Sequence, residues 1–238
     1  MLKLVCITAL LWKSLAEVPS EQEREYILKL HTDLREQVDP PASNMLMLSY
    51  SFELEKLANA HVARCTSSSP DGQKQPEYNG LGLVTKVGEQ NKLSSFEELS
   101  ILNHERLQYD YETNSCKEWC YFYKQAVWAN NSEIGCAKHS CISGDNGKSY
   151  RYRVACLYRY TGNIIKALPY ERGESCTRCP KKYVCEQNQC AKQSAQRSTS
   201  SSKASAPTRP SALGFFNAAV LILFFLQHRN WIILIYYA

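Results

Sequence analysis

Residues 121–137 read YFYKQAVWANNSEIGCA, and this stretch carries most of the fold prediction. Aromatic residues and valine fill its first half, which predicts a strand over residues 122–128. A second run of the same character, YRYRVACLY at residues 150–158, predicts another strand. Shorter apolar runs predict strands at residues 134–137 and 81–87. The stretch therefore belongs to a short β-sheet.

Helical patterns surround these strands. Apolar residues at three- and four-residue spacing predict helices over residues 20–38, 50–65 and 94–109. Ser20 and Glu23 have the spacing of a capping box at the start of the first helix, and Ser95 and Glu98 have it at the third. Helices on both faces of a short sheet predict an α/β fold, a three-layer α-β-α sandwich.

The first 16 residues have the pattern of a secretory signal peptide. Lys3 gives a positive start, an apolar run follows, and the small residues Ser14 and Ala16 stand as before a cleavage site. The apolar run is too short to span a bilayer. We therefore expect export, with residues 1–16 removed.

Cysteine use fits an exported chain. Eleven cysteines are present and Cys6 would leave with the signal, so an even ten remain in an oxidising compartment. These predict five disulfides. Cys176 and Cys179 have the two-residue gap of a zinc or redox motif. Because Cys185 and Cys190 follow closely, a small disulfide knot is the favoured interpretation.

Composition changes beyond the predicted main domain, residues 17–172. Residues 173–190 hold four cysteines and little apolar content, so they predict a disulfide-rich hinge. Residues 191–212 form a Ser/Pro-rich stalk. Residues 213–238 are largely apolar and follow small and polar residues, as in a glycolipid-anchor signal. A retained membrane helix, with Arg229 near its end, and a plain secreted form are the alternatives.

Charge and glycosylation signals agree with an extracellular surface. The formal net charge is +5, without the clustered basic residues that nucleic-acid binding requires, so no nucleic-acid partner is expected. Asn130 opens the glycosylation sequon Asn-Asn-Ser directly after an aromatic run. We therefore expect Asn130 at a turn.

Spaced motifs resemble the superfamily of cysteine-rich secretory proteins, antigen 5 and plant pathogenesis-related protein 1, known as the CAP superfamily. Its first signature is roughly G-H-Y-T-Q-V-V-W-A followed by I-G-C. Residues 121–137 agree with that signature at Tyr123, Gln125, Val127, Trp128, Ala129, Gly135 and Cys136. The second signature, V-C-N-Y-x-P-x-G-N, is kept at Cys156, Tyr158, Gly162 and Asn163.

Upstream, the family's first-helix motif H-N-x-L-R is matched by His31, Leu34 and Arg35. The resemblance covers about residues 22–190 and implies the family's α-β-α fold. Within the family, NHERLQY and the segment 169–190 resemble the branch of glioma pathogenesis-related and peptidase-inhibitor-type members. The resemblance also implies a disulfide pairing: Cys65–Cys141, Cys136–Cys156, Cys116–Cys120, Cys176–Cys185 and Cys179–Cys190.

Many members of the family hold a divalent metal with two histidines and two glutamates. Here the second histidine position is Phe122, and residues 66–75 contain no histidine for the first. The first glutamate position falls in Gly80-Leu81-Gly82, or at Glu89 in a shifted alignment, and the second remains as Glu105. One or two carboxylates without a histidine cannot hold zinc well. We therefore expect no metal and no other cofactor. The chain's other histidines are interpreted as surface or core residues: His31, His61, His104 and His139.

These observations predict a non-enzymatic extracellular recognition module with an unidentified protein partner. No free cysteine nucleophile remains after pairing, and no G-x-S-x-G elbow is present. Sterol or lipid carriage is one alternative, because Tyr121, Tyr123 and Trp128 fit an aromatic spacing linked to sterol contacts in the family. Protease inhibition is another, resting on the resemblance alone. Membrane contact would come from the C-terminal tail.

Overall fold

The computed structural model describes residues 17–66, 68–90, 95–143, 149–160 and 162–193. The chain divides into two units, Met1–Ser194 and Ala195–Ala238, and the second lies outside the described residues. The predicted signal peptide at residues 1–16, the apolar tail at residues 213–238 and nearly all of the predicted stalk also fall outside them.

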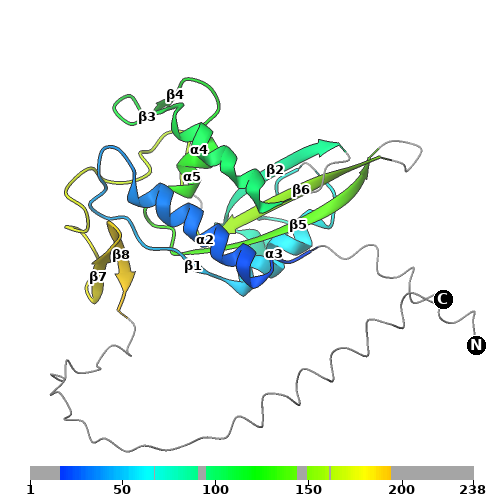
Figure 1. Ribbon diagram of the computed structural model, residues 1–238, viewed down its shortest axis with the longest axis horizontal. Coiled ribbons are helices and arrows are strands. Elements are labelled where there is room, and N and C mark those ends of the chain that lie inside the picture. Colours follow the sequence, from blue (N-terminus) through cyan, green and yellow to red (C-terminus); the bar gives the residue numbers. More distant parts are fainter. Residues whose placement is uncertain (1–16, 67, 91–94, 144–148, 161, 194–238) are drawn as a thin grey trace, which may run out of the picture. The chain divides into compact units, whose positions relative to one another are not determined.

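A four-stranded sheet forms the middle layer of the first unit (Figure 1). Its strands run in the order β1 (Ser49–Tyr50), β5 (Glu133–Ser143), β6 (Ser149–Tyr158) and β2 (Gly82–Gln90). The short β1 is parallel to β5, while the other neighbours are antiparallel. Successive side chains on β6 point to opposite faces, so each face is covered by its own apolar cluster.

Helices cover both faces of this sheet, which confirms the predicted three-layer sandwich (Figure 1). One face packs against α2 (Glu21–Glu36), η3 (Phe96–Ser100), α4 (Ile101–Arg106) and α5 (Tyr121–Ala126). The other face packs against α3 (Phe52–Val62). The remaining short elements are η2 (Pro76–Tyr78), β3 (Tyr109–Asp110), β4 (Ser115–Cys116), β7 (Tyr183–Glu186) and β8 (Gln189–Lys192).

The close approach of α3 to the sheet explains a glycine in the signature stretch. A Cβ on Gly135 would lie 2.2 Å from the backbone nitrogen of Glu55 in α3. A side chain there would push the helix off β5, so only glycine lets the two backbones approach this closely. The disulfide Cys65–Cys141 then joins the end of α3 to β5.

The prediction of a strand over residues 122–128 is wrong, because this segment forms α5, a short helix. Tyr123, Gln125 and Ala126 are all buried, so the segment shows no polar face by which a helix could be recognised. The carboxylate of Glu105 also accepts a hydrogen bond from the N–H of Tyr123 in its first turn. Tertiary contacts therefore override the strand propensity of the aromatic residues.

The predicted helices are present, with shorter bounds. The first carries the complete capping box of Ser20 and Glu23. The third predicted helix, residues 94–109, is two elements in the structure, η3 followed by α4. The strand β3 then begins at Tyr109. Ser95 does cap η3, but its side chain accepts from the N–H of Glu97, and no reciprocal bond from Glu98 is found among the described residues.

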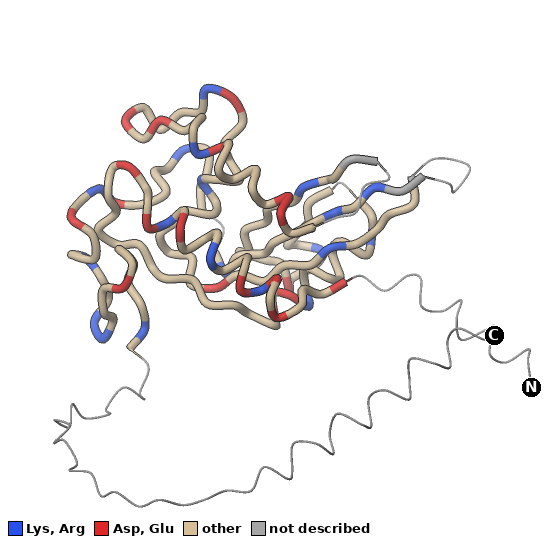
Figure 2. The backbone as a smooth tube through the Cα atoms, in the orientation of Figure 1, with Lys and Arg blue, Asp and Glu red and all other residues tan. Residues whose placement is uncertain are grey.

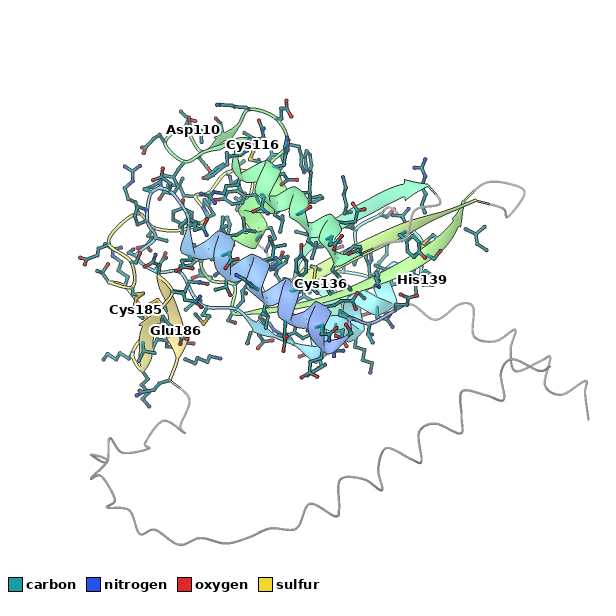
Figure 3. The ribbon with its side chains drawn as sticks, in the orientation of Figure 1. Asp110, Cys116, Cys136, His139, Cys185 and Glu186 are labelled. Carbon is teal, nitrogen blue, oxygen red and sulfur yellow. A yellow bond between two sulfur atoms is a disulfide. The ribbon has the colours of Figure 1, made fainter. Side chains whose placement is uncertain are left out.

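The five disulfides have the pairing that the resemblance implies. Cys136 and Cys156 are register partners on β5 and β6, so their bond crosses the middle of the sheet (Figure 3). The bond between Cys116 and Cys120 closes a short loop before α5. The last two pairs lie in the cysteine-rich segment at residues 173–190.

This cysteine-rich segment is docked on the main domain through its backbone. The N–H of Met47 donates to Cys190 O at 2.9 Å, and the N–H of Cys190 donates to Met45 O at 2.6 Å. The N–H of Arg178 donates to Ser43 O at 2.9 Å in the same region. Two disulfides hold the segment in the shape that makes these bonds, because its apolar content is too small to do so alone.

Candidate functional site

Glu105 is the surviving metal-ligand position predicted from the resemblance, and in the structure its carboxylate serves the backbone. The residue is 3% exposed near the end of α4. Its Oε2 accepts a 2.9 Å hydrogen bond from the N–H of Tyr123. Burial raises the pKa of Glu105, and the backbone N–H groups of Tyr123 and Phe122 oppose that rise. Glu105 therefore holds the start of α5.

Phe122 stands in the first turn of α5, where the resemblance places a histidine. Its ring is half-buried and packs at the margin of the larger apolar cluster. The indole of Trp119 meets Phe122 edge-on at 5.9 Å and Tyr121 at 4.8 Å between ring centroids. Trp119 is 58% exposed. We call Trp119, Tyr121 and Phe122 the aromatic cluster.

The residues at the predicted metal position do not fit a zinc ion. Glu105 offers a carboxylate that already accepts from a backbone N–H, and the phenyl ring of Phe122 has no ligand atom. Leu81, at the other glutamate position, packs beside the smaller apolar cluster. In the alternative alignment, the side chain of Glu89 lies outside the described residues.

Elsewhere among the described residues, Cys65, His139 and Cys141 bring three potential metal-ligand atoms within 4.8 Å of one another. His139 lies on β5 near the disulfide (Figure 3). The two cysteines are bonded to each other, and a zinc ligand must be a free thiolate. The group is therefore a disulfide with a neighbouring histidine.

The four histidines predicted to be surface or core residues differ in burial. His31 and His61 are buried, His139 is half-buried and His104 is exposed. His31 joins α2 to β6, since its Nε2 lies 2.8 Å from the hydroxyl of Tyr158 and its Nδ1 lies 2.7 Å from Ile27 O.

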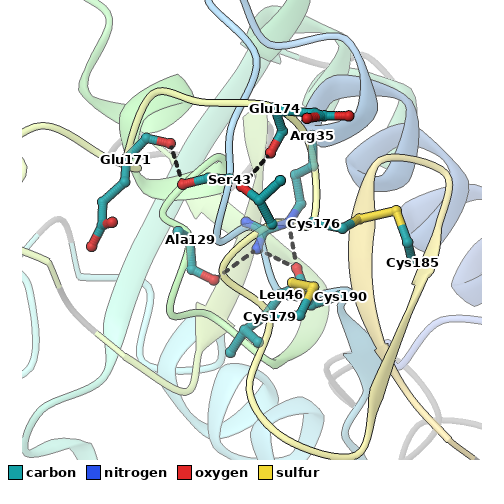
Figure 4. The surroundings of a disulfide bond; sticks show 11 residues. Arg35, Ser43, Leu46, Ala129, Glu171, Glu174, Cys176, Cys179, Cys185 and Cys190 are labelled. Atoms are coloured by element: carbon teal, nitrogen blue, oxygen red, sulfur yellow. Dashed lines mark hydrogen bonds between the residues drawn. A yellow bond between two sulfur atoms is a disulfide. The ribbon is translucent and has the colours of Figure 1, made fainter.

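Arg35 positions the loop that follows α5, a role that sequence reasoning missed. Its side chain is 1% exposed and donates to five backbone carbonyls. These belong to Leu46, Ala126, Trp128, Ala129 and Asn131. Figure 4 shows the guanidinium between Leu46 and Ala129, beside the cysteine-rich segment. The match to H-N-x-L-R marked the residue, but only the tertiary structure shows what it binds.

Asn130 lies at a turn after α5, as predicted, and is exposed there. The next residue, Asn131, is fully buried and donates from Nδ2 to Gln125 O at 2.9 Å. Asn130 lines an open depression of about 460 Å³ together with aromatic and charged residues of the segment 168–178. The position is therefore accessible from solvent.

A second pocket, also missed from the sequence, lies beside Leu81. It has a volume of about 230 Å³ and is lined by Ser69, Pro70, Tyr78, Leu81, Leu83 and Leu157. Leu83 and Leu157 are register partners on β2 and β6. Leu81, one of the two positions that the resemblance offers for the family's first glutamate, therefore contributes an apolar side chain to a pocket. We call it the leucine pocket.

Comparison with known proteins agrees with this geometry. Residues 28–158 match the profile described as the cysteine-rich secretory protein family, CAP. GLIPR1-like protein 1 of Mus musculus is 34% identical over 187 residues, covering 75% of this chain and 77% of the mouse protein. Peptidase inhibitor 16 of Bos taurus is 33% identical over 176 residues, covering 72% of this chain and only 36% of the bovine protein. These relatives confirm the predicted branch.

Solved structures agree in fold. Schistosoma mansoni venom allergen-like protein 4 gives a TM-score of 0.52 at 24% identity, covering 65% of this chain and 97% of that one. The structure of NaASP2 with Zn²⁺ gives a TM-score of 0.56 at 21% identity, covering 73% of this chain and 100% of that one. From the profile match over more than half of its length and from the mouse relative, the chain belongs to the cysteine-rich secretory protein family.

Proposed function

We propose that this chain is a non-enzymatic extracellular recognition module whose contact surface centres on the aromatic cluster. The observation that carries the proposal is the exposed indole of Trp119, braced edge-on by Tyr121 and Phe122. Exposed Trp and Tyr side chains on a rigid support are the residues that most often dominate protein interfaces. The Cys116–Cys120 disulfide supports the loop that presents them.

The chemistry of the remnant metal position favours binding over catalysis. A carboxylate that accepts from the N–H of Tyr123 is committed to the fold, and Phe122 replaces a metal-binding imidazole with an apolar ring. Phe122, which stands where the resemblance implies a ligand histidine, is therefore also a member of the aromatic cluster. Acidic and basic residues are interspersed over the described chain, which suits a protein partner better than a nucleic acid (Figure 2).

Export and membrane attachment form part of the proposal. Five disulfides suit an oxidising compartment, and the matched family is described as secretory. Within the described residues, no helix has the length and apolarity to cross a bilayer. We propose that residues 213–238 direct attachment of a glycolipid anchor. Release of the chain from cells by phosphatidylinositol-specific phospholipase C tests this, and persistence on the membrane, beside a cleaved control anchor, contradicts it.

The test of recognition is an unbiased extracellular binding screen with the full-length chain. A partner found in the screen should lose at least about tenfold in affinity with Trp119→Ala, as for an interface hot spot. Phe52→Ala is the matched control, because Phe52 is a 66% exposed aromatic residue on α3. Equal binding by the Trp119→Ala variant would remove the aromatic cluster from the contact surface.

Two other functions are outcomes of parallel assays. Saturable sterol binding by the purified chain would favour lipid carriage, and loss of a target protease's activity would favour inhibition. Calorimetry with zinc at neutral pH should show no binding. A micromolar one-site isotherm would contradict the proposed degenerate metal site.

A further inference from the structure

The leucine pocket is built from parts that are fixed by the fold. Leu83 and Leu157 lie side by side on antiparallel strands, and Tyr78 stands at the end of η2. The Tyr78 hydroxyl donates to Leu57 O at 2.9 Å and accepts from Arg64 Nη2 at 3.2 Å. These bonds hold the tyrosine wall in place, so a ligand would pay little to order it.

The size of the pocket restricts its occupant. At about 230 Å³ it is smaller than the roughly 300–1,000 Å³ of sites for drug-sized ligands. Three leucines and the ring of Tyr78 line it beside Ser69 and Pro70, so it offers contacts to an apolar group and to a polar group. A single branched or aromatic side chain suits this volume, whereas a whole sterol does not.

A cation stands next to the pocket wall. The Arg64 guanidinium lies over the Tyr78 ring, 5.4 Å from its centroid. Its hydrogen bonds go to Tyr78 and to the Gln75 side chain, which are both neutral. A guanidinium has five N–H donors, so others remain for a ligand.

The charges around this cation leave it available. Among the described residues no carboxylate pairs with Arg64, although Glu77 is close enough to act electrostatically on Tyr78. The nearest histidine, His61, is buried and its pKa is lowered by burial and by Arg64 and Arg153. Asp71, next to Pro70, is paired with Lys74, so Arg64 can still bind a carboxylate from a ligand.

We propose that the leucine pocket binds a carboxylate that carries one apolar group of side-chain size, with the apolar group against the leucines and the carboxylate on Arg64. Two sources share this chemistry: a short free acid and the C-terminal residue of a peptide. The site is separate from the aromatic cluster, and the inference does not depend on the proposed function.

The experiment titrates the full-length chain with 4-methylpentanoate, with its uncharged amide, and with a short peptide ending in leucine, free or amidated at its C-terminus. Saturation-transfer NMR and calorimetry report binding. We expect the charged forms to bind saturably and the amides to bind about tenfold more weakly, because the charged hydrogen bond is lost. Arg64→Gln should abolish this preference.

Matched variants locate the site. Ser69 is exposed at the pocket, so Ser69→Trp should block binding without touching the core. Ser68→Trp changes a neighbouring exposed residue that does not line the pocket and should bind normally. Circular dichroism checks that both variants fold.

Each outcome decides the matter. Binding of the acid without the peptide assigns the site to free acids, and binding of both assigns it to peptide C-termini as well. Binding that survives Ser69→Trp, equal binding of acid and amide, or no saturable binding of either charged probe overturns the proposal.

Discussion

The hydroxyl of Tyr158 and the imidazole of His31 form a 2.8 Å hydrogen bond that joins β6 to α2 across the larger apolar cluster. The other ring nitrogen of His31 lies 2.7 Å from Ile27 O, so it must carry a proton and donate. Nε2 is then the acceptor and Tyr158 the donor. This arrangement requires a neutral imidazole.

His31 should make the protein less stable in acid. Burial, opposed by the bond to Ile27 and reinforced by Arg35, lowers the pKa of His31 to about 4. The unfolded chain takes up the proton near pH 6.5, so stability is lost as pH falls from 6.5 to about 4. The loss attributable to this residue is about 3 kcal/mol. Urea unfolding of His31→Gln should lack this part of the pH dependence, while His104→Gln should keep it.

Glu105 should make the protein less stable as pH rises, which is the opposite of the effect of His31. Burial raises the pKa of this carboxyl above 4.5. Between pH 4.5 and that higher pKa, the folded state therefore binds more protons than the unfolded state. Stability falls there, and Glu105→Gln avoids the loss because its amide stays neutral and its oxygen can still accept from Tyr123. The variant should match the wild type in acid and exceed it at neutral pH.

Glu105→Ala is the companion variant. It leaves the N–H of Tyr123 without its acceptor and should cost about 1–3 kcal/mol in the free energy of unfolding. A Glu105→Ala protein as stable as Glu105→Gln at neutral pH would show that the hydrogen bond has no structural role.

Arg35 should be the costliest of the polar substitutions. Arg35→Met leaves five buried carbonyls without this donor, so we expect about 4 kcal/mol of destabilisation. Thermal and urea unfolding measure it. Arg178→Met, an exposed arginine paired with Glu171, should change stability by less than about 1 kcal/mol.

The disulfides should differ in their contribution to stability according to loop length. Cys65 and Cys141 are 76 residues apart, whereas Cys116 and Cys120 are 4 apart. The chain-entropy relation gives about 4.5 kcal/mol for the first and about 2 kcal/mol for the second. Paired Cys→Ser variants in denaturant test this order, and equal losses would contradict the entropic account.

Asn130 should carry an N-linked glycan when the chain is made in a secretory system. The side chain is exposed at a turn, so it is accessible to the transferase. Glycosidase treatment should increase the gel mobility of the wild type and leave Asn130→Gln unchanged. A wild-type chain without a mobility shift would contradict the prediction.

Much of the architecture was predictable because it depends on local patterns. The apolar spacing and capping box at Ser20 predicted α2, and the aromatic residues and valine in residues 150–158 predicted β6. Residues 122–128 were not predictable in this way. The consecutive side chains 123–128 are all buried, so the pattern carries no period, and a contact with Glu105, 18 residues earlier, decides the outcome.

The sequence by itself indicated the family, the five disulfides of ten cysteines, and Phe122 at the position where the resemblance implies a histidine, since these depend on residue identity and spacing. Only the tertiary structure decided what the remaining groups do. It commits Glu105 to a backbone N–H, surrounds Arg35 with carbonyls, and places Leu81 against Leu157 in a pocket. The physical reason is that hydrogen bonds and apolar contacts form between residues distant in sequence, and no local pattern records which partner each will meet.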